Sequence, residues 1–148
     1  MPRYEVAALT TLTAASVPFA TLVAGASSRM RILEIGITLA TAVASDIALA
    51  KSATATTTPT KILGQQVDAA DIAAIGSLAI AWSTIGTANS ISMRRIQFPA
   101  TIGAGVIWTW PDNDPLILAA PAATTELMFV NRGGGVCGTF TIYVAWRE

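Results

Sequence analysis

The chain has 148 residues, of which 53% are hydrophobic, nine are basic, nine are acidic, one is cysteine and none is histidine. Without imidazole the chain cannot build a Ser–His–Asp triad, a Cys–His pair or a His-ligated metal site, and one thiol cannot form a cysteine-based zinc site. The charge is sparse and scattered, without a basic stripe, so we expect no enzymatic activity, no cofactor, no metal and no nucleic-acid partner.

The N-terminal residues 4–13 are expected to form a strand. An alternative is a secretion signal within the uncharged stretch 7–28, since Arg3 precedes an apolar run and Ala26 could end a cleavage site. Threonines dilute that apolar run, so the strand is our expectation. Polar residues likewise interrupt the second uncharged stretch, 72–93, and no membrane span is expected.

The next elements follow from hydrophobic periodicity. Residues 31–39 alternate between apolar and other side chains, which predicts a half-buried strand, and residues 47–52 are expected to pair with it. Residues 52–59 are rich in Thr and Ala without periodicity and are expected to form an exposed loop. The one helix expected is short, over residues 67–75, with Asp68 as its cap.

The rest of the chain predicts further strands separated by turns. These strands are residues 78–82, 93–98, 106–110, 116–118, 126–130 and 138–148. Residues 111–115, with two prolines around Asp-Asn-Asp, predict a tight turn, and the glycine-rich residues 131–135 predict a hairpin loop. We therefore predict one all-β domain over residues 1–148, an antiparallel two-sheet sandwich of jelly-roll type with eight or nine strands and an N-terminal arm of about residues 1–14.

Four features that could carry chemistry are explained more simply by structure. Asp112 and Asp114 have the spacing of a calcium loop, but the glycine and the bidentate glutamate of that loop are missing, so a turn is expected. The glycine run 133–135 leads into a strand rather than a helix, which argues against a phosphate-binding loop. No two acids are marked as a glycosidase pair. The single cysteine, Cys137, is expected to be a small buried apolar residue.

Tryptophans and arginines are the candidate interaction residues. The tryptophans lie on the apolar phase of their predicted strands, which favours core or subunit-interface positions over sugar stacking: Trp82, Trp108, Trp110 and Trp146. The arginines are expected to be either solvated edge charges or interface anchors that pair with acids on a neighbouring subunit: Arg29, Arg31, Arg94 and Arg95.

Several motifs carry a resemblance to a known class of proteins. They are RMRILEIGI at residues 29–37, AWS at 81–83, RRI at 94–96, GAGVIWTWP at 103–111, and YVAWRE at 143–148, after the glycine-rich loop. With these motifs the chain resembles small structural proteins of tailed bacteriophages, of the capsid decoration or cement type. The resemblance implies a β-sandwich or jelly roll, often trimeric, bound to the outer face of an assembled shell, and it implies no catalytic residues.

We therefore expect a virion protein that associates with itself and binds the major capsid protein on the outer capsid surface. The residues expected at the subunit or capsid interface are Arg29, Arg31, Arg94, Arg95, Trp108 and Trp110, with the loop 52–59 and the N-terminal arm touching the shell. The first alternative is a tail, fibre or lectin-like module that binds carbohydrate through exposed tryptophans. The second is a secreted β domain with a cleaved signal.

Overall fold

The fold is that of a computed structural model, which describes residues 1–120, 122 and 124–148. The described part of the chain contains strands and no helix, so it also holds none that could cross a membrane. The thirteen strands are β1 (Arg3–Leu9), β2 (Pro18–Val23), β3 (Met30–Leu39), β4 (Ser45–Thr54), β5 (Thr57–Leu63), β6 (Gln65–Gln66), β7 (Ser77–Thr84), β8 (Thr87–Ala88), β9 (Arg94–Phe98), β10 (Gly105–Thr109), β11 (Leu116–Leu118), β12 (Leu127–Asn131) and β13 (Phe140–Arg147).

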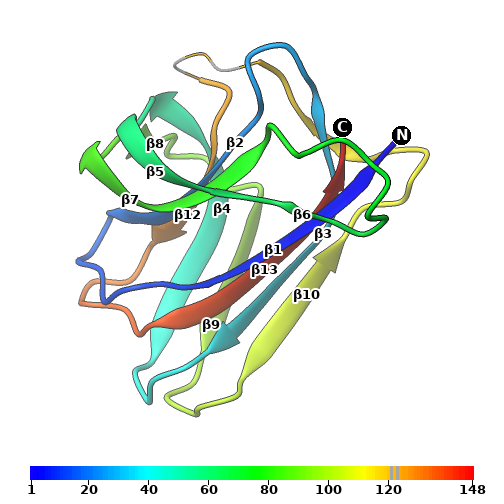
Figure 1. The fold of residues 1–148 in the computed structure, drawn as a ribbon. Coiled ribbons are helices and arrows are strands. Elements are labelled where there is room, and N and C mark those ends of the chain that lie inside the picture. Colours follow the sequence, from blue (N-terminus) through cyan, green and yellow to red (C-terminus); the bar gives the residue numbers. More distant parts are fainter. Residues whose placement is uncertain (121, 123) are drawn as a thin grey trace.

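The strands form two antiparallel sheets that pack face to face (Figure 1). The six-stranded sheet has the order β10-β3-β13-β1-β6, and β11 also pairs with β3. The seven-stranded sheet has the order β5-β7-β2-β12-β4-β8, and β9 also pairs with β4. Because β1 pairs with β13, β2 with β12, β3 with β10 and β4 with β9, the pairs are nested as in a jelly roll, with β5 to β8 inserted. The predicted all-β sandwich of two antiparallel sheets is confirmed, with thirteen strands in place of the eight or nine expected.

Aromatic side chains from both sheets fill the core. The Phe140 ring of the six-stranded sheet lies 5.4 Å from the Phe19 ring and 5.5 Å from the Phe98 ring, both of the seven-stranded sheet. The Tyr4 and Trp146 rings lie 5.9 Å apart, and both side chains are fully buried. Distances of this size are those of offset or tilted aromatic pairs, which stabilise a core beyond the area they bury.

A bulge in β3 changes the predicted faces of that strand. Ala145 pairs with Glu34 but Trp146 pairs with Ile32, so Leu33 is an extra residue in the ladder. As a result Ile32 is fully buried and Leu33 only half-buried, whereas uniform alternation would place Leu33 inside and Ile32 outside. The direction of Arg31 follows from the same bulge, because this residue lies between the buried Met30 and Ile32 and points outward.

Two expectations for the N-terminal half are wrong. The first is that residues 47–52 pair with the preceding strand: β4 instead crosses to the other sheet and pairs with β12, β9 and β8. The second is the exposed loop over residues 52–59, which instead contains the end of β4, a short turn and the start of β5. Ser52 and Thr56 in this segment are buried. Threonine favours strands, so this threonine-rich segment forms strands although its sequence shows no hydrophobic alternation.

The helix expected over residues 67–75 is also wrong. The Asp68 carboxylate accepts a hydrogen bond from the Ala70 N–H at 2.9 Å, but this closes a single turn. The chain then extends, because the Tyr4 hydroxyl donates to the Ile72 carbonyl at 2.9 Å and the Glu148 carboxylate accepts from the Gly76 N–H. These tertiary bonds override a weak local helical preference.

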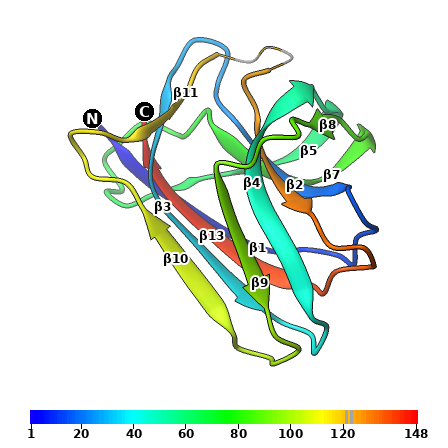
Figure 2. The ribbon, with the colours of Figure 1, turned by 180° about the vertical axis from the view of Figure 1, so that it is seen from behind.

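The segment considered as a secretion signal forms β1 and β2 of this domain (Figures 1 and 2). The N-terminal strand is confirmed over Arg3–Leu9, paired along its whole length with β13. All six residues of β2 are buried in the middle of the seven-stranded sheet. Cleavage near Ala26 would therefore remove two strands and the core side chains Tyr4 and Phe19.

Candidate interaction surface

One open side of the sandwich brings together three of the predicted interface residues, Arg94, Trp108 and Trp110. There β9 is an edge of the seven-stranded sheet and β10 an edge of the six-stranded sheet, joined by a short turn (Figure 2). The Arg94 guanidinium carbon lies 5.8 Å from the centroid of the Trp110 ring, within the range of a cation–π contact. Arg94 is exposed and the two tryptophans are half-buried.

Alternation along β10 separates an inner and an outer set of side chains. Val106, Trp108 and Trp110 pack against the core, whereas Ile107 and Thr109 are exposed. Ile107 is 62% exposed and is one of fourteen large apolar side chains that the described residues expose. The apolar phase predicted for the tryptophans is confirmed for Trp108 and Trp110, as it is for the fully buried Trp146 on β13.

Arg95 is held within the chain. Its guanidinium forms a two-bonded ion pair with Asp46 of β4, with Arg95 Nε donating to Asp46 Oδ1 at 2.8 Å. The hydrogen bond from Arg95 lowers the pKa of the Asp46 carboxyl below its usual value, although partial burial acts in the opposite direction. Arg95 therefore fastens edge strand β9 to β4, and its guanidinium is already hydrogen-bonded to a carboxylate of the same chain.

This ion pair predicts a pH-dependent contribution to stability. Since the pKa of Asp46 is lower in the folded than in the unfolded state, the contribution is present above the unfolded value of about 3.9 and is lost as pH falls through the folded value. Replacing Asp46 by Asn should lower the free energy of unfolding by about 0.5–1 kcal/mol at pH 7 and by less at pH 3, measured by urea unfolding. Asp114→Asn, at an exposed position, is the control. An equal loss at both pH values would contradict the prediction.

Arg31 belongs to a row of three arginines on the outer face of the six-stranded sheet. Arg147 lies between Arg3 and Arg31, directly opposite each in the ladder. Arg3 pairs with Glu5 at 2.9 Å and Arg147 with Asp112 at 3.1 Å. Like charges opposite one another destabilise a sheet, and these two carboxylates offset that repulsion.

Arg29 and Arg31 differ from the other predicted arginines in their partners. Within residues 1–120, 122 and 124–148, neither has a carboxylate within 4.0 Å or a ring beneath it, whereas Arg95 pairs with Asp46 and Arg94 lies over Trp110. Arg29 is exposed at the turn before β3, and Arg31 is half-buried beside Met1. Both guanidinium groups are therefore available to a carboxylate from outside the chain.

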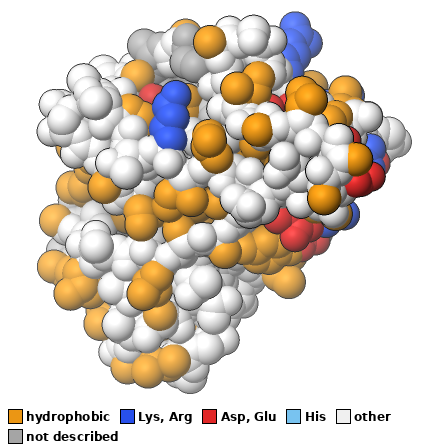
Figure 3. Space-filling view, in the orientation of Figure 1, with side chains coloured by type: hydrophobic (Ala, Val, Ile, Leu, Met, Phe, Trp, Pro, Cys, Tyr) orange, Lys and Arg blue, Asp and Glu red, His pale blue; other side chains and the backbone are white. Residues whose placement is uncertain are grey.

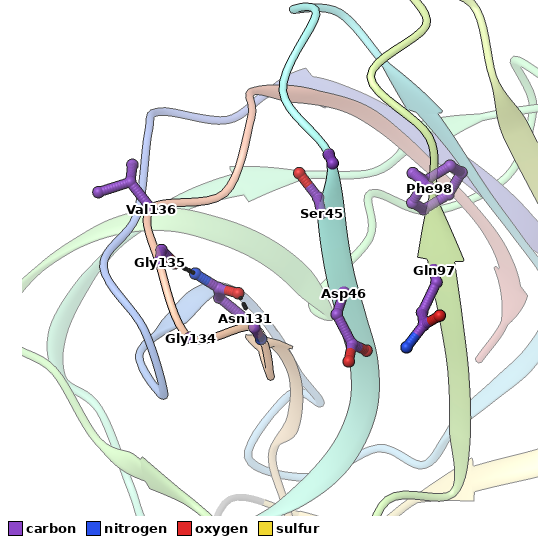
Figure 4. A pocket seen from close by; sticks show the side chains of 10 residues that line it. Ser45, Asp46, Gln97, Phe98, Asn131, Gly134, Gly135 and Val136 are labelled. Atoms are coloured by element: carbon purple, nitrogen blue, oxygen red, sulfur yellow. Dashed lines mark hydrogen bonds between the residues drawn. The ribbon is translucent and has the colours of Figure 1, made fainter.

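The glycine-rich loop borders an open surface pocket of about 270 Å³, together with the start of β4 and the end of β9 (Figure 4). The loop is not the hairpin that the sequence predicted, since it joins β12 of one sheet to β13 of the other. Asn131 fixes it: its Nδ2 donates to the Gly135 carbonyl at 2.7 Å and its Oδ1 accepts from the Gly133 N–H at 2.9 Å. Asn131 is thus bonded to the loop and Asp46 to Arg95, so these two polar side chains of the pocket have structural roles.

The remaining candidate groups have structural roles. Asp112 pairs with Arg147, and the Asp114 N–H donates to the Pro111 carbonyl at 2.9 Å, which closes the predicted turn. Among the described residues, no three His, Cys, Asp or Glu side chains gather as metal ligands. Cys137 is buried as expected, and burial raises the pKa of its thiol.

Sequence reasoning missed Ile107 and the partners of the arginines. The partners come from strands distant in sequence, so no local pattern marks them. A large aliphatic residue on the outward phase of a predicted strand was the available signal for Ile107. No family model, curated protein or solved structure matches this chain.

Proposed function

We propose that the protein is a structural protein of a bacteriophage virion, a decoration or cement protein that binds the major capsid protein on the outer surface of the assembled head. It acts by mass action: a protein that binds the assembled lattice but not loose subunits stabilises the lattice by an amount that grows with the logarithm of one plus the ratio of its free concentration to its dissociation constant. The jelly-roll fold suits this role but does not specify it, because one fold serves many functions.

The character of the surface is the observation that supports this proposal. Fourteen of the described residues are large apolar side chains exposed to solvent, against eighteen charged residues in the whole chain. The lower part of the face in Figure 3 is apolar or uncharged, with the Lys, Arg, Asp and Glu side chains higher up and at its right edge. Apolar surface on this scale favours coverage by a partner or by further copies.

Self-association is part of the proposal. The resemblance implies a trimer, and the number of copies is argued below from the sheet edges. Arg29 and Arg31 are the residues we assign to polar contacts with the shell, because their guanidinium groups are free to meet acidic groups of the capsid.

The test mixes the purified protein with heads that lack it and measures co-sedimentation and the melting temperature of the heads. We expect binding and a higher melting temperature. The double variant Arg29→Ala/Arg31→Ala should weaken binding by about tenfold or more, whereas Arg95→Ala, whose guanidinium is bonded to Asp46, should change it little. A protein that neither sediments with heads nor changes their melting would refute the capsid role.

Carbohydrate binding is the alternative, and one feature favours it. Trp82 is half-buried in a surface groove of about 320 Å³, beside Leu12 and Ile85. Trp108 faces the core and Arg94 lies over Trp110, which leaves Trp82 as the tryptophan best placed to stack on a sugar. Iodide quenching of tryptophan fluorescence that soluble sugar blocks, and that Trp82→Ala abolishes, would favour this alternative over the capsid role.

A further inference from the structure

Strand β10 differs from the other edges of the two sheets. Edge strands are a liability, and proteins protect them with charge, proline, bulges or shortness. β5 carries Pro59 and Lys61 with a register shift between them, and β9 carries Arg94 and Arg95. β11 has three residues, and β1 carries charges and is partly covered by β6. By contrast, β10 (Gly105–Thr109) is uncharged, has no proline and pairs with β3 without a register shift.

The free edge of β10 presents a defined set of backbone groups. Trp110 N donates to the Leu33 carbonyl at 2.8 Å, and Leu39 N donates to the Ala104 carbonyl at 2.8 Å, so the even-numbered residues face β3. Hydrogen bonding alternates along an antiparallel ladder. The N–H and C=O groups that point away from β3 therefore belong to Gly105, Ile107 and Thr109. In both ribbon views β10 lies at the margin of the molecule (Figures 1 and 2).

We propose that β10 pairs with β10 of a second copy, antiparallel, about a two-fold axis that passes beside Ile107. In this register Ile107 lies opposite Ile107 of the second copy, and Gly105 lies opposite Thr109. Each of these is a closely spaced pair that exchanges both hydrogen bonds, so every outward N–H and C=O group of β10 finds a partner. A two-fold contact of this kind is self-complementary and closed.

Side chains on the outer face suit this register. The row across the sheet at Ile107 continues through Gly36 to Tyr143. The Tyr143 ring lies against Gly36, since a Cβ atom on Gly36 would come 2.3 Å from that ring. The row at the two-fold axis is therefore apolar, and pairing buries Ile107 against its symmetry mate.

Charge also permits the pairing. No residue of β10 is charged, so like charges do not meet at the axis. The nearest acid on this face, Glu34, lies opposite Thr109, one strand inside the edge. Thr109 would in turn lie opposite Gly105 of the second copy. The next residue in that row is Thr38 of the second copy, the partner of Gly105 in the ladder, so Glu34 does not meet an acid there.

This pairing gives an even number of copies, unlike the trimer that the resemblance implies. The proposed pairing depends only on the free edge of β10 in the unbound protein, so it holds whether or not the protein binds a shell. The first test measures the mass of the purified protein by sedimentation and light scattering. We expect a dimer, and Ile107→Lys should weaken dimerisation by about 30-fold or more because it places two like charges at the axis.

Ile91→Lys is the matched control, since Ile91 is 75% exposed and lies outside the strands. Circular dichroism checks that both variants fold. A wild-type monomer, a trimer, or a dimer that Ile107→Lys leaves intact would overturn the proposal.

A second variant tests the register directly. Opposite residues of a closely spaced pair have Cα atoms about 5.5 Å apart, a separation that a disulfide can span. Cys137, the only cysteine, is buried, so wild-type protein should not cross-link. Mild oxidation should convert Ile107→Cys into a covalent dimer but leave Ile91→Cys monomeric under denaturing conditions. Equal cross-linking of the two variants, or none in Ile107→Cys, would refute the register.

Discussion

Replacing Trp146 by alanine is expected to lower the free energy of unfolding by about 3–5 kcal/mol, a large share of the roughly 5–15 kcal/mol that stabilises a domain. Trp146 is the largest of the fully buried side chains. Its ring packs against Tyr4, and its indole N–H donates to the Glu148 carboxylate at 2.8 Å. The same ring lies against Gly64, where a Cβ atom would come 2.4 Å from it. Alanine therefore leaves a cavity and removes one of the three hydrogen bonds that the Glu148 carboxylate accepts, the other two coming from the Ile75 and Gly76 N–H groups.

Two control variants show how much of this loss in stability comes from the indole N–H and how much from the burial of the ring. Trp146→Phe keeps most of the ring but not the N–H, so its loss should be smaller than that of Trp146→Ala. Trp82→Ala removes the same side chain from a half-buried position on β7 and should cost less still. Urea unfolding followed by circular dichroism gives all three values. If Trp82→Ala cost as much as Trp146→Ala, the core would not be centred on Trp146.

The strands with one buried and one exposed face were predictable. In β13, Phe140, Ile142 and Val144 are buried, while Thr141 is exposed and Tyr143 half-buried, and the sequence alternates in the same way. Strand β10 shows the same alternation. A period of two is a strong signal when solvent lies on one side, which is why these elements and the all-β class could be predicted.

The strands that were missed lack this contrast between faces. β2 is buried on both sides and β5 is largely exposed on both, so neither sequence alternates. The helix expected near Asp68 failed for a different reason. There, distant groups at Tyr4 and Glu148 hold the following residues extended, and a local pattern carries no information about them.

The candidate interaction surface was likewise predictable only in part. Arg94, Trp108 and Trp110 come together because β9 and β10 are neighbours in the chain. The Asp46–Arg95 pair and the arginine row depend on the register between strands far apart in sequence. Whether a strand lies at an edge is likewise a property of the whole sheet, so the free edge of β10 could not be predicted from its own residues.

The second large effect is expected for Gly86→Ala, which should lower the free energy of unfolding by about 1–3 kcal/mol. A Cβ atom at position 86 would come 2.3 Å from the Thr54 carbonyl oxygen and 2.8 Å from the Ala55 carbonyl carbon. Both are backbone atoms at the end of β4, so no flexible side chain can move aside. The Met128 methyl group, in a second small core cluster, lies at 2.8 Å from the same point.

Gly134→Ala is the matched control for this substitution, because a Cβ atom there meets no atom within 4 Å, and its effect should stay within about 0.5 kcal/mol. Urea unfolding measures both variants, and hydrogen exchange reports whether residues 85–93 open. Ala88 of that segment packs against Ala50, Met128 and Val130, so its release would expose apolar surface on the seven-stranded sheet. An unchanged stability of Gly86→Ala would mean that this segment does not pack against the end of β4. If the segment opens, the variant should also bind a hydrophobic dye and associate through a face other than β10, and Ile107→Lys should not reverse that association.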